Sequence, residues 1–199
     1  MREIVCDQRT PEWYAARVGR PTASSFSHVM TTKFKRSIQR DDYLKKLARE
    51  RETGVKEESY VSNPMSRGIA MEDQAIAALS MIHDIEVRKV GFCLSDDGLY
   101  GCSPDGFVVD DMGGVEAKCP TLKIHREYLR SGRLVSKYFL QVHGCMLVTG
   151  MPWWYFVSYH PEEKPLILRV FRDENIISKM RHEILIFCKE LDKLIMRKE

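Results

Sequence analysis

Residues Ser103 to Lys118, with the sequence SPDGFVVDDMGGVEAK, contain two short apolar runs separated by an acidic segment with two glycines. The apolar runs are predicted to form strands, and the segment between them has the residue types of a hairpin turn. Because side chains alternate between faces along a strand, Glu116 and Lys118 share one face. Folding back at the turn brings Asp105 within a residue or two of Glu116. The sequence therefore predicts a hairpin that gathers two carboxylates and one amine.

This cluster has the composition of a metal-dependent hydrolase site. Carboxylate oxygens suit Mg²⁺, which keeps several waters and commonly binds substrate phosphate as well. A bound ion would polarise a phosphoryl oxygen and lower the pKa of a water, and a second ion would stabilise the leaving oxygen. Lys118 would orient that water or take its proton, since desolvation pushes an amine towards its neutral form. On spacing alone, however, a surface hairpin with an ordinary Glu/Lys pair is the simpler interpretation.

Length and composition predict one soluble domain covering residues 1–199, and they favour neither an enzyme nor a binding module. The chain is 44% hydrophobic and 30% charged, values that are ordinary for a globular protein. No run approaches the roughly 18 apolar residues of a membrane span, and the N-terminus lacks a signal-peptide pattern, so a cytoplasmic protein is expected. The six cysteines form no CxxC pair, which argues against zinc, iron–sulfur clusters and disulfides.

Charge is distributed unevenly along the chain. Residues 17–40 contain six basic side chains and no acidic ones, whereas residues 72–116 contain ten acids and two bases. An acidic centre suits a metal site, and a basic segment attracts a phosphate backbone through counterion release. A solvated, mobile surface explains the basic segment equally well.

Periodicity and capping signals predict an alternation of helices and strands. A short helix is expected from Pro11 to Arg17, with Thr10 as its cap and a stop at Gly19, and its Trp13 is expected in the core. The other expected helices cover residues 41–52, 63–82, 125–129, 138–148 and 173–197, and a further short one ends at Met30. The other expected strands cover residues 85–92, 99–102, 153–157 and 166–171. The six histidines are expected to make structural hydrogen bonds.

The hairpin resembles a known nuclease motif. Pro104-Asp105 followed by Glu116-Ala117-Lys118 resembles the PD-(D/E)XK motif, which alone is degenerate. Three more stretches, residues 13–24, 67–73 and 141–150, resemble in order the phage lambda exonuclease or YqaJ viral recombinase family, over roughly residues 13–159. The resemblance implies an α/β fold with a restriction-endonuclease-like core, in which helices flank a mixed central β-sheet.

The same resemblance implies roles for particular residues. Asp105 and Glu116 would bind metal with the Ala117 carbonyl as a possible further ligand, and Lys118 would handle the attacking water. The assisting residues would be Glu72 and Gln141. The terminal 5′ phosphate of the degraded strand would be held by Arg17, Thr22 and Ser24. For Arg17, the simpler alternative is a capped helix with an exposed arginine. For Glu72 it is a solvated side chain, and for Gln141 it is a polar residue that bonds the backbone at the edge of the core.

The activity that the resemblance implies is exonucleolytic. The protein would be a Mg²⁺-dependent 5′ to 3′ exonuclease that leaves 3′ overhangs on double-stranded DNA for recombination. It would use two ions, with Mn²⁺ as a possible substitute. It would be a homotrimeric ring working with a single-strand annealing protein, encoded by a phage or prophage. Two rivals remain from the residues themselves: an endonuclease on the same core, and a catalytically silent DNA-binding module.

Overall fold

The computed structural model describes residues 1–57 and 63–196, with only the backbone of residues 63–67 and 69. The loop predicted at residues 56–61 lies largely outside this range. The helices are α1 (Pro11–Arg17), the 3-10 turn η1 (Ala23–Ser25), α2 (Phe26–Val29), α3 (Arg40–Thr53), α4 (Asn63–His83), α5 (Leu122–Ser131), α6 (Ser136–Thr149) and α7 (Glu174–Met196). The strands are β1 (Arg2–Ile4), β2 (Val87–Arg88), β3 (Phe92–Leu94), β4 (Gly101–Cys102), β5 (Gly106–Val108), β6 (Gly113–Lys118), β7 (Trp153–Ser158) and β8 (Leu166–Phe171).

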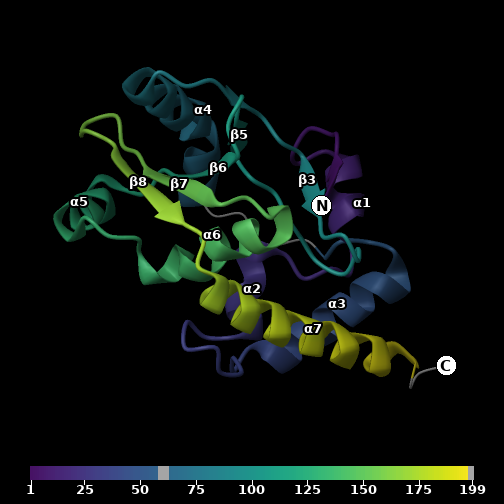
Figure 1. The fold of residues 1–199 in the computed structure, drawn as a ribbon. Coiled ribbons are helices and arrows are strands. Elements are labelled where there is room, and N and C mark those ends of the chain that lie inside the picture. Colours follow the sequence, from purple (N-terminus) through teal and green to yellow (C-terminus); the bar gives the residue numbers. More distant parts are fainter. Residues whose placement is uncertain (58–62, 197–199) are drawn as a thin grey trace.

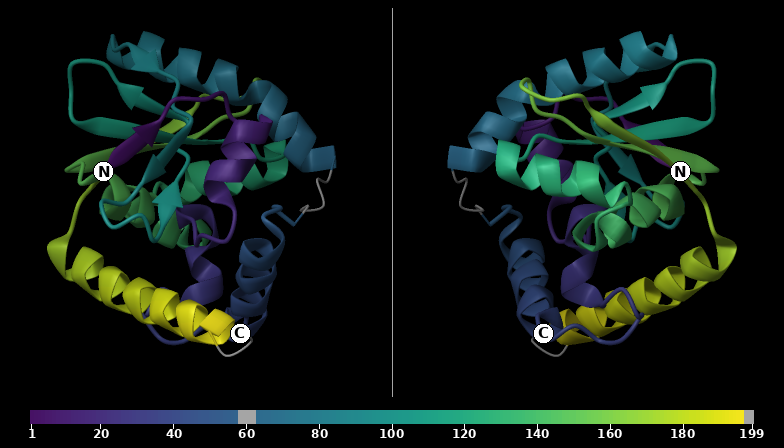
Figure 2. Two further views of the ribbon diagram at one scale, coloured as in Figure 1. Left: turned by 90° about the vertical axis from the view of Figure 1, so that its right-hand side faces the viewer. Right: turned by 90° about the vertical axis from the view of Figure 1, so that its left-hand side faces the viewer.

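A mixed sheet with the strand order β2-β5-β6-β7-β8 forms the centre of the described part of the chain. The β6–β7 pair is parallel and the other pairs are antiparallel. All residues of β7 are buried, as expected for an aromatic and β-branched strand that is covered on both faces. Helix α4 covers one face and α6 the other (Figures 1 and 2). The predicted α/β class with a mixed central sheet is confirmed.

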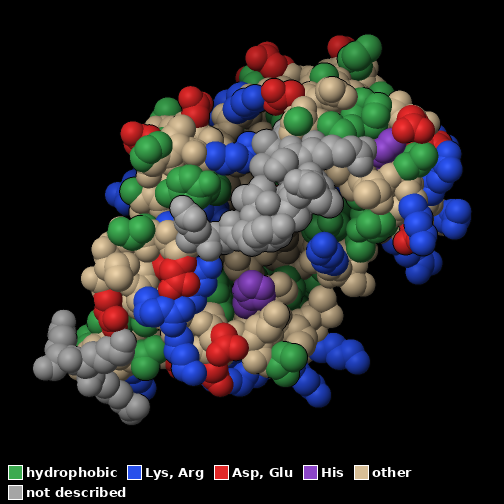
Figure 3. Space-filling view, turned by 180° about the vertical axis from the view of Figure 1, so that it is seen from behind, with side chains coloured by type: hydrophobic (Ala, Val, Ile, Leu, Met, Phe, Trp, Pro, Cys, Tyr) green, Lys and Arg blue, Asp and Glu red, His purple; other side chains and the backbone are tan. Residues whose placement is uncertain are grey.

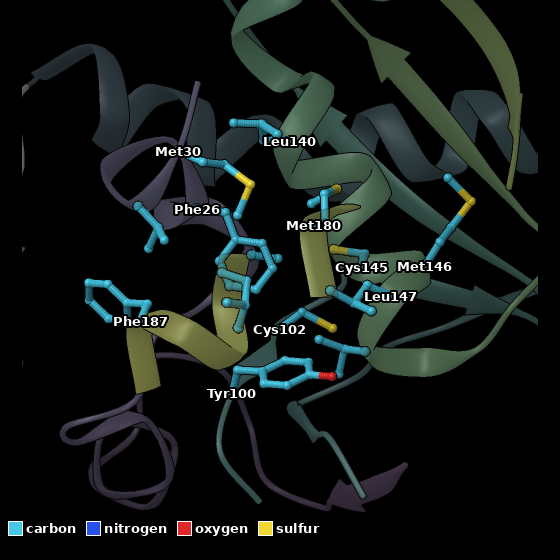
Figure 4. Packing of buried hydrophobic residues seen from close by; sticks show 14 of the residues in the cluster. Phe26, Met30, Tyr100, Cys102, Leu140, Cys145, Met146, Leu147, Met180 and Phe187 are labelled. Atoms are coloured by element: carbon cyan, nitrogen blue, oxygen red, sulfur yellow. The ribbon is translucent and has the colours of Figure 1, made fainter. Parts of the chain in front are cut away.

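The larger apolar core lies on the α6 side of the sheet. Helices α2, α3 and α7 pack there beneath α6, around Phe26, Met146 and Phe187 (Figure 4). The apolar residues Tyr43, Leu44, Leu47 and Ala48 of α3 are buried in this core, and Gly54 ends that helix in the left-handed conformation at φ +68°.

A smaller sheet, β1-β3-β4, corrects one prediction. The strand expected at residues 85–92 is split: β2 pairs with β5 in the central sheet, and β3 pairs with the N-terminal strand β1. Gly91 allows the break, because a Cβ there would lie 2.3 Å from the carbonyl oxygen of Cys6. The backbone therefore passes too close to the N-terminal segment for any other side chain.

Two expectations from composition can be compared with the described residues. Cys93, Cys102, Cys145 and Cys188 are buried thiols. Among residues 1–57 and 63–196, no helix has the length and apolarity needed to cross a membrane.

Candidate active site

The predicted hairpin is confirmed as β5 and β6, with Gly106 opposite Val115. The Asp105 amide donates to the Val115 carbonyl at 3.1 Å, and its Oδ2 accepts from the Ala117 amide at 2.6 Å. These two bonds fix Asp105 at the end of β5, level with Glu116. Because both polar groups of a residue in a strand point to the same side, the Ala117 carbonyl faces the edge where Asp105 lies.

Glu116 is the most buried acid of the cluster, at 1% exposure. Its Oε1 pairs with the Lys118 amine and accepts from Gln141 Nε2 at 2.5 Å. Its Oε2 is buried and has no hydrogen-bond partner among the residues that the structure describes. Burying a carboxylate oxygen without a hydrogen-bond partner costs free energy. A ligand that binds Oε2 would remove this cost, and no described protein group has to be displaced first.

The electrostatics of the cluster are those of two desolvated acids with one cation. Burial raises the pKa of Asp105 well above its ordinary value and the Glu116 charge adds to the shift, while burial also raises the pKa of Glu116. Burial alone would lower the pKa of Lys118, but Glu116 and Asp105 outweigh it and leave that pKa raised. The neutral amine expected from the sequence is therefore not favoured while Lys118 neutralises the carboxylates.

The donor set fits a hard cation. Asp105, Glu116 Oε2 and the Ala117 carbonyl all offer oxygen, and one or two carboxylates are a usual Mg²⁺ complement. Within the described residues no group of three or more His, Cys, Asp or Glu side chains comes together at metal-binding distance. A metal held here would have two carboxylates and a carbonyl as protein ligands, and water or substrate phosphate would complete the shell.

Glu72 lies beside this cluster rather than inside it. It projects from α4 with its side chain 20% exposed, and its Oε2 accepts from Arg9 Nη2 at 2.9 Å. Glu72 and Asp105 line the same cavity, whose volume is about 580 Å³. The structure therefore brings the predicted third acid next to the hairpin, already paired with an arginine.

Gln141 lies on α6 and contacts the cluster through Glu116. Its side-chain amide donates a hydrogen bond to Oε1 and leaves the buried Oε2 unpartnered, so Gln141 orients the carboxylate. The expected placement of this glutamine next to the acids is observed.

The predicted phosphate-binding residues also come together. Arg17 Nη2 lies 3.5 Å from Thr22 Oγ1, which is 3.3 Å from Ser24 Oγ. Thr22 is buried and Ser24 is exposed. Burial lowers the pKa of Arg17, as expected for a cation that is partly removed from water. A half-buried arginine beside two hydroxyls is a suitable site for an anion.

Ser103 is a residue that sequence reasoning did not select. Its Oγ accepts from Arg17 Nη1 at 2.8 Å and from Trp13 Nε1 at 2.9 Å. Trp13 is half-buried rather than in the core, and the Arg17 guanidinium lies 4.1 Å from its ring centroid. The signal available in the sequence was the position of Ser103, directly before Pro104-Asp105.

Most arginines of the basic segment at residues 17–40 make contacts within the protein, whereas Lys33 and Lys35 are exposed. Arg20 donates to the Gly98 and Ala16 carbonyls, and Arg36 pairs with Asp41 and Glu190. Arg40 is buried, and Arg17 bonds Ser103 as described above. Most of the arginines that suggested a DNA-binding arm therefore hold the fold together.

The histidines have mainly structural surroundings, as predicted. The His125 ring accepts from the Ser158 hydroxyl at 2.7 Å and donates to the Lys164 carbonyl at 3.0 Å. His143 corrects the expectation in detail: its buried Nδ1 has no hydrogen-bond partner among the described residues, and its ring packs 4.5 Å from that of Phe139.

Solved structures similar to this chain were found by comparison. An alkaline exonuclease (LHK-Exo) from Laribacter hongkongensis is 32% identical, with 94% of this chain and 95% of that chain covered and a TM-score of 0.86, and its complex with dAMP matches equally well. A phage-related exonuclease from Haemophilus somnus 129PT shares the fold at 14% identity, with 90% and 96% covered and a TM-score of 0.70. No curated protein sequence matched the chain.

The family assignment rests on a match over most of the chain. The model of the YqaJ-like viral recombinase domain matches residues 12–152, a range that includes the Arg17 pocket, the hairpin and Gln141. The chain therefore belongs to the YqaJ-like viral recombinase domain family.

Proposed function

We propose that this protein is a Mg²⁺-dependent exonuclease that degrades the 5′-ended strand of double-stranded DNA in the 5′ to 3′ direction. The observation that carries the proposal is the unpartnered, buried Oε2 of Glu116 beside Asp105, with Lys118 next to both. The similarity to an alkaline exonuclease at 32% identity over almost the whole chain supports a nuclease acting on DNA ends. We take residues 1–199 as one nuclease domain.

Asp105, Glu116 and the Ala117 carbonyl would hold the metal. When bound, Mg²⁺ would polarise the scissile phosphoryl oxygen, make a bound water more acidic and lower the pKa of Lys118 by neutralising the two carboxylates. Lys118 then orients the attacking water and takes its proton. Gln141 keeps Glu116 in one orientation throughout. Two ions, or Mn²⁺ in place of Mg²⁺, are compatible with this donor set.

Direction of degradation follows from the Arg17 pocket. A guanidinium with the hydroxyls of Thr22 and Ser24 is suited to a terminal phosphate, which carries more charge than a phosphodiester. Arg17 is held to Ser103, two residues before Asp105. A 5′ phosphate in this pocket would therefore place the first phosphodiester of that strand towards the carboxylates.

A basic surface for the rest of the duplex is available near the hairpin. On the face opposite that of Figure 1, Lys and Arg side chains gather at the end of the molecule formed by α5 (Figure 3). Lys123, Arg126 and Arg130 of this helix line a cavity of about 450 Å³. Helix α5 begins four residues after Lys118, so these cations suit the DNA backbone beyond the cleavage point.

The biological setting is proposed from the family. The protein would act as a homotrimeric ring around DNA, in the cytoplasm of a bacterial host, encoded by a phage or prophage. Its 3′ single-stranded product would pass to a single-strand annealing protein, which completes recombination.

The test is nucleotide release from linear duplex DNA with Mg²⁺. Ends carrying a 5′ phosphate are compared with 5′-hydroxyl ends, and closed circular DNA and a Glu116→Gln enzyme serve as controls. The proposal expects faster release from phosphorylated ends, none from circles and none from the variant. Cutting of the circle would make the protein an endonuclease. Binding without any release would make it a catalytically silent DNA-binding module.

A further inference from the structure

Arg9 lies at the catalytic cavity, although no motif of the sequence marks it. Its guanidinium bonds Glu72 at 2.9 Å, and both residues line the cavity of about 580 Å³ that also contains Asp105. The Arg9 side chain is 41% exposed, so its remaining donors are accessible from the cavity. A planar guanidinium that is paired with one carboxylate and partly open to solvent can bind a phosphate through its remaining donors without changing its position.

The backbone at Arg9 is strained and firmly held. Its φ is +69°, in the left-handed region that only glycine adopts without cost. On one side, Gln8 donates to the carbonyls of Val90 and Pro104 at 2.9 and 2.8 Å. On the other side, Thr10 donates to the Asp7 carbonyl at 2.8 Å and caps α1. Because Pro104 precedes Asp105, these bonds fix Arg9 relative to the catalytic hairpin.

Stability does not explain an arginine at this position. A left-handed conformation disfavours any side chain with a Cβ, and a partly exposed ion pair returns little free energy. Glycine would serve the turn better. Strain that persists beside a catalytic cavity is more often associated with function than with folding.

Helix α1 has one arginine near each of its ends. Arg9 precedes the helix and contacts Glu72, and Arg17 ends it and contacts Ser103. A seven-residue helix is roughly 10 Å long, so the two arginines leave the backbone about that far apart. Their guanidiniums bond different residues, Glu72 and Ser103.

We propose that Arg9 binds a backbone phosphate of the degraded strand at the catalytic cavity, separate from the terminal phosphate at Arg17. Glu72 holds the guanidinium in place in the free protein, and the DNA phosphate takes over its free donors when the strand enters. The inference rests on the proposed function, because it assumes that DNA lies along the cavity next to Asp105.

The test measures affinity for a 5′-phosphorylated duplex in EDTA at several salt concentrations. Arg9→Ala and Arg9→Gly are both expected to bind DNA about tenfold more weakly, as for loss of one charged hydrogen-bonded contact. The slope of log K against log salt should also become shallower by about 0.9 in both variants. Arg9→Gly removes the backbone strain, so its melting temperature should equal or exceed that of the parent. Loss of binding with gain of stability is not expected of a structural arginine.

Two controls make the result specific. Glu72→Gln breaks the same ion pair but keeps the arginine, so it should retain the parental salt slope. Arg49→Ala removes an arginine of similar exposure that pairs with Glu57 at 2.7 Å on α3, and it should also keep the slope. An equal change in Arg9→Ala and either control would overturn the proposal, and so would a parental slope in both Arg9 variants. If the parent releases no nucleotides with Mg²⁺, the proposed function fails instead, and the binding result is read separately.

Discussion

Arg17 donates a hydrogen bond to Ser103 across 86 residues of sequence, at 2.8 Å. Ser103 stands two residues before Asp105, whose backbone and side chain are bonded to β6. The guanidinium is therefore joined to the carboxylate cluster by one hydrogen bond and a short piece of fixed backbone. A phosphate bound at Arg17 would be held at a constant distance from the acids, which is what removal of one nucleotide at a time requires.

Arg17→Ala should abolish the preference for phosphorylated ends. A charged hydrogen bond contributes about 1.5–3 kcal/mol, so release from 5′-phosphoryl DNA should fall about 10- to 100-fold, while release from 5′-hydroxyl DNA changes little. The measurement is the ratio of the two rates at subsaturating DNA. An unchanged ratio would remove the phosphate pocket from the mechanism.

Arg20→Ala is the matched control for that prediction. Arg20 belongs to the same loop but donates to the carbonyls of Gly98 and Ala16. Its loss should affect both kinds of end equally, because it loosens the loop without removing a phosphate donor.

The catalytic hairpin could be predicted from the sequence because its pairing is local. Asp105 and Glu116 are joined by a tight turn, so alternation along one strand determines which side chains meet. Ser103 and Arg9 could not be found in this way. Their roles depend on contacts with Arg17 and Glu72, which are distant in sequence, and no periodicity encodes such contacts.

Gly113 and Gly114 are glycines for a reason that the sequence pattern does not show. The sequence pattern predicts a turn at these residues, but the structure places them in β6. A Cβ on either would lie within 2.5 Å of several ring atoms of Trp153 or Trp154. The glycines are needed because two indoles of β7 pack on the strand, and only the folded sheet reveals this requirement.

Arg40→Ala should destabilise the helical layer strongly. Arg40 is 1% exposed, bonds Glu190 at 3.0 Å and donates to the Val29 carbonyl at 3.3 Å. Its removal leaves the buried Val29 carbonyl without this donor and a space where the arginine packed, which should cost about 1–3 kcal/mol, measurable as a lower midpoint in urea. The control is Arg36→Ala, which removes an exposed partner of the same Glu190 and should cost less than about 1 kcal/mol. Similar losses in both variants would contradict the prediction.

His143 should make the protein less stable in mild acid. Burial lowers its pKa below the usual 6.5, so the unfolded chain binds the proton more readily than the folded one. Stability is therefore complete above pH 6.5 and falls as the pH drops below it, by at most about 1.4 kcal/mol per pH unit for one such group. In His143→Leu, the loss in unfolding free energy between pH 7.5 and 5.0 should be smaller. An identical loss in both proteins would show that other groups cause it.

Glu116→Gln should separate metal binding from folding. The variant removes a buried charge whose pKa burial already raises, so its melting temperature in EDTA should equal or exceed that of the parent. The parent should gain stability with Mg²⁺, by about 2.7 kcal/mol at one hundred times the dissociation constant, and the variant should gain much less. Lys118→Ala keeps both carboxylates, so it should retain the Mg²⁺ response and DNA binding while losing cleavage. A full Mg²⁺ response in Glu116→Gln would place the metal elsewhere, because the proposed metal site depends on the unpartnered Oε2 of Glu116.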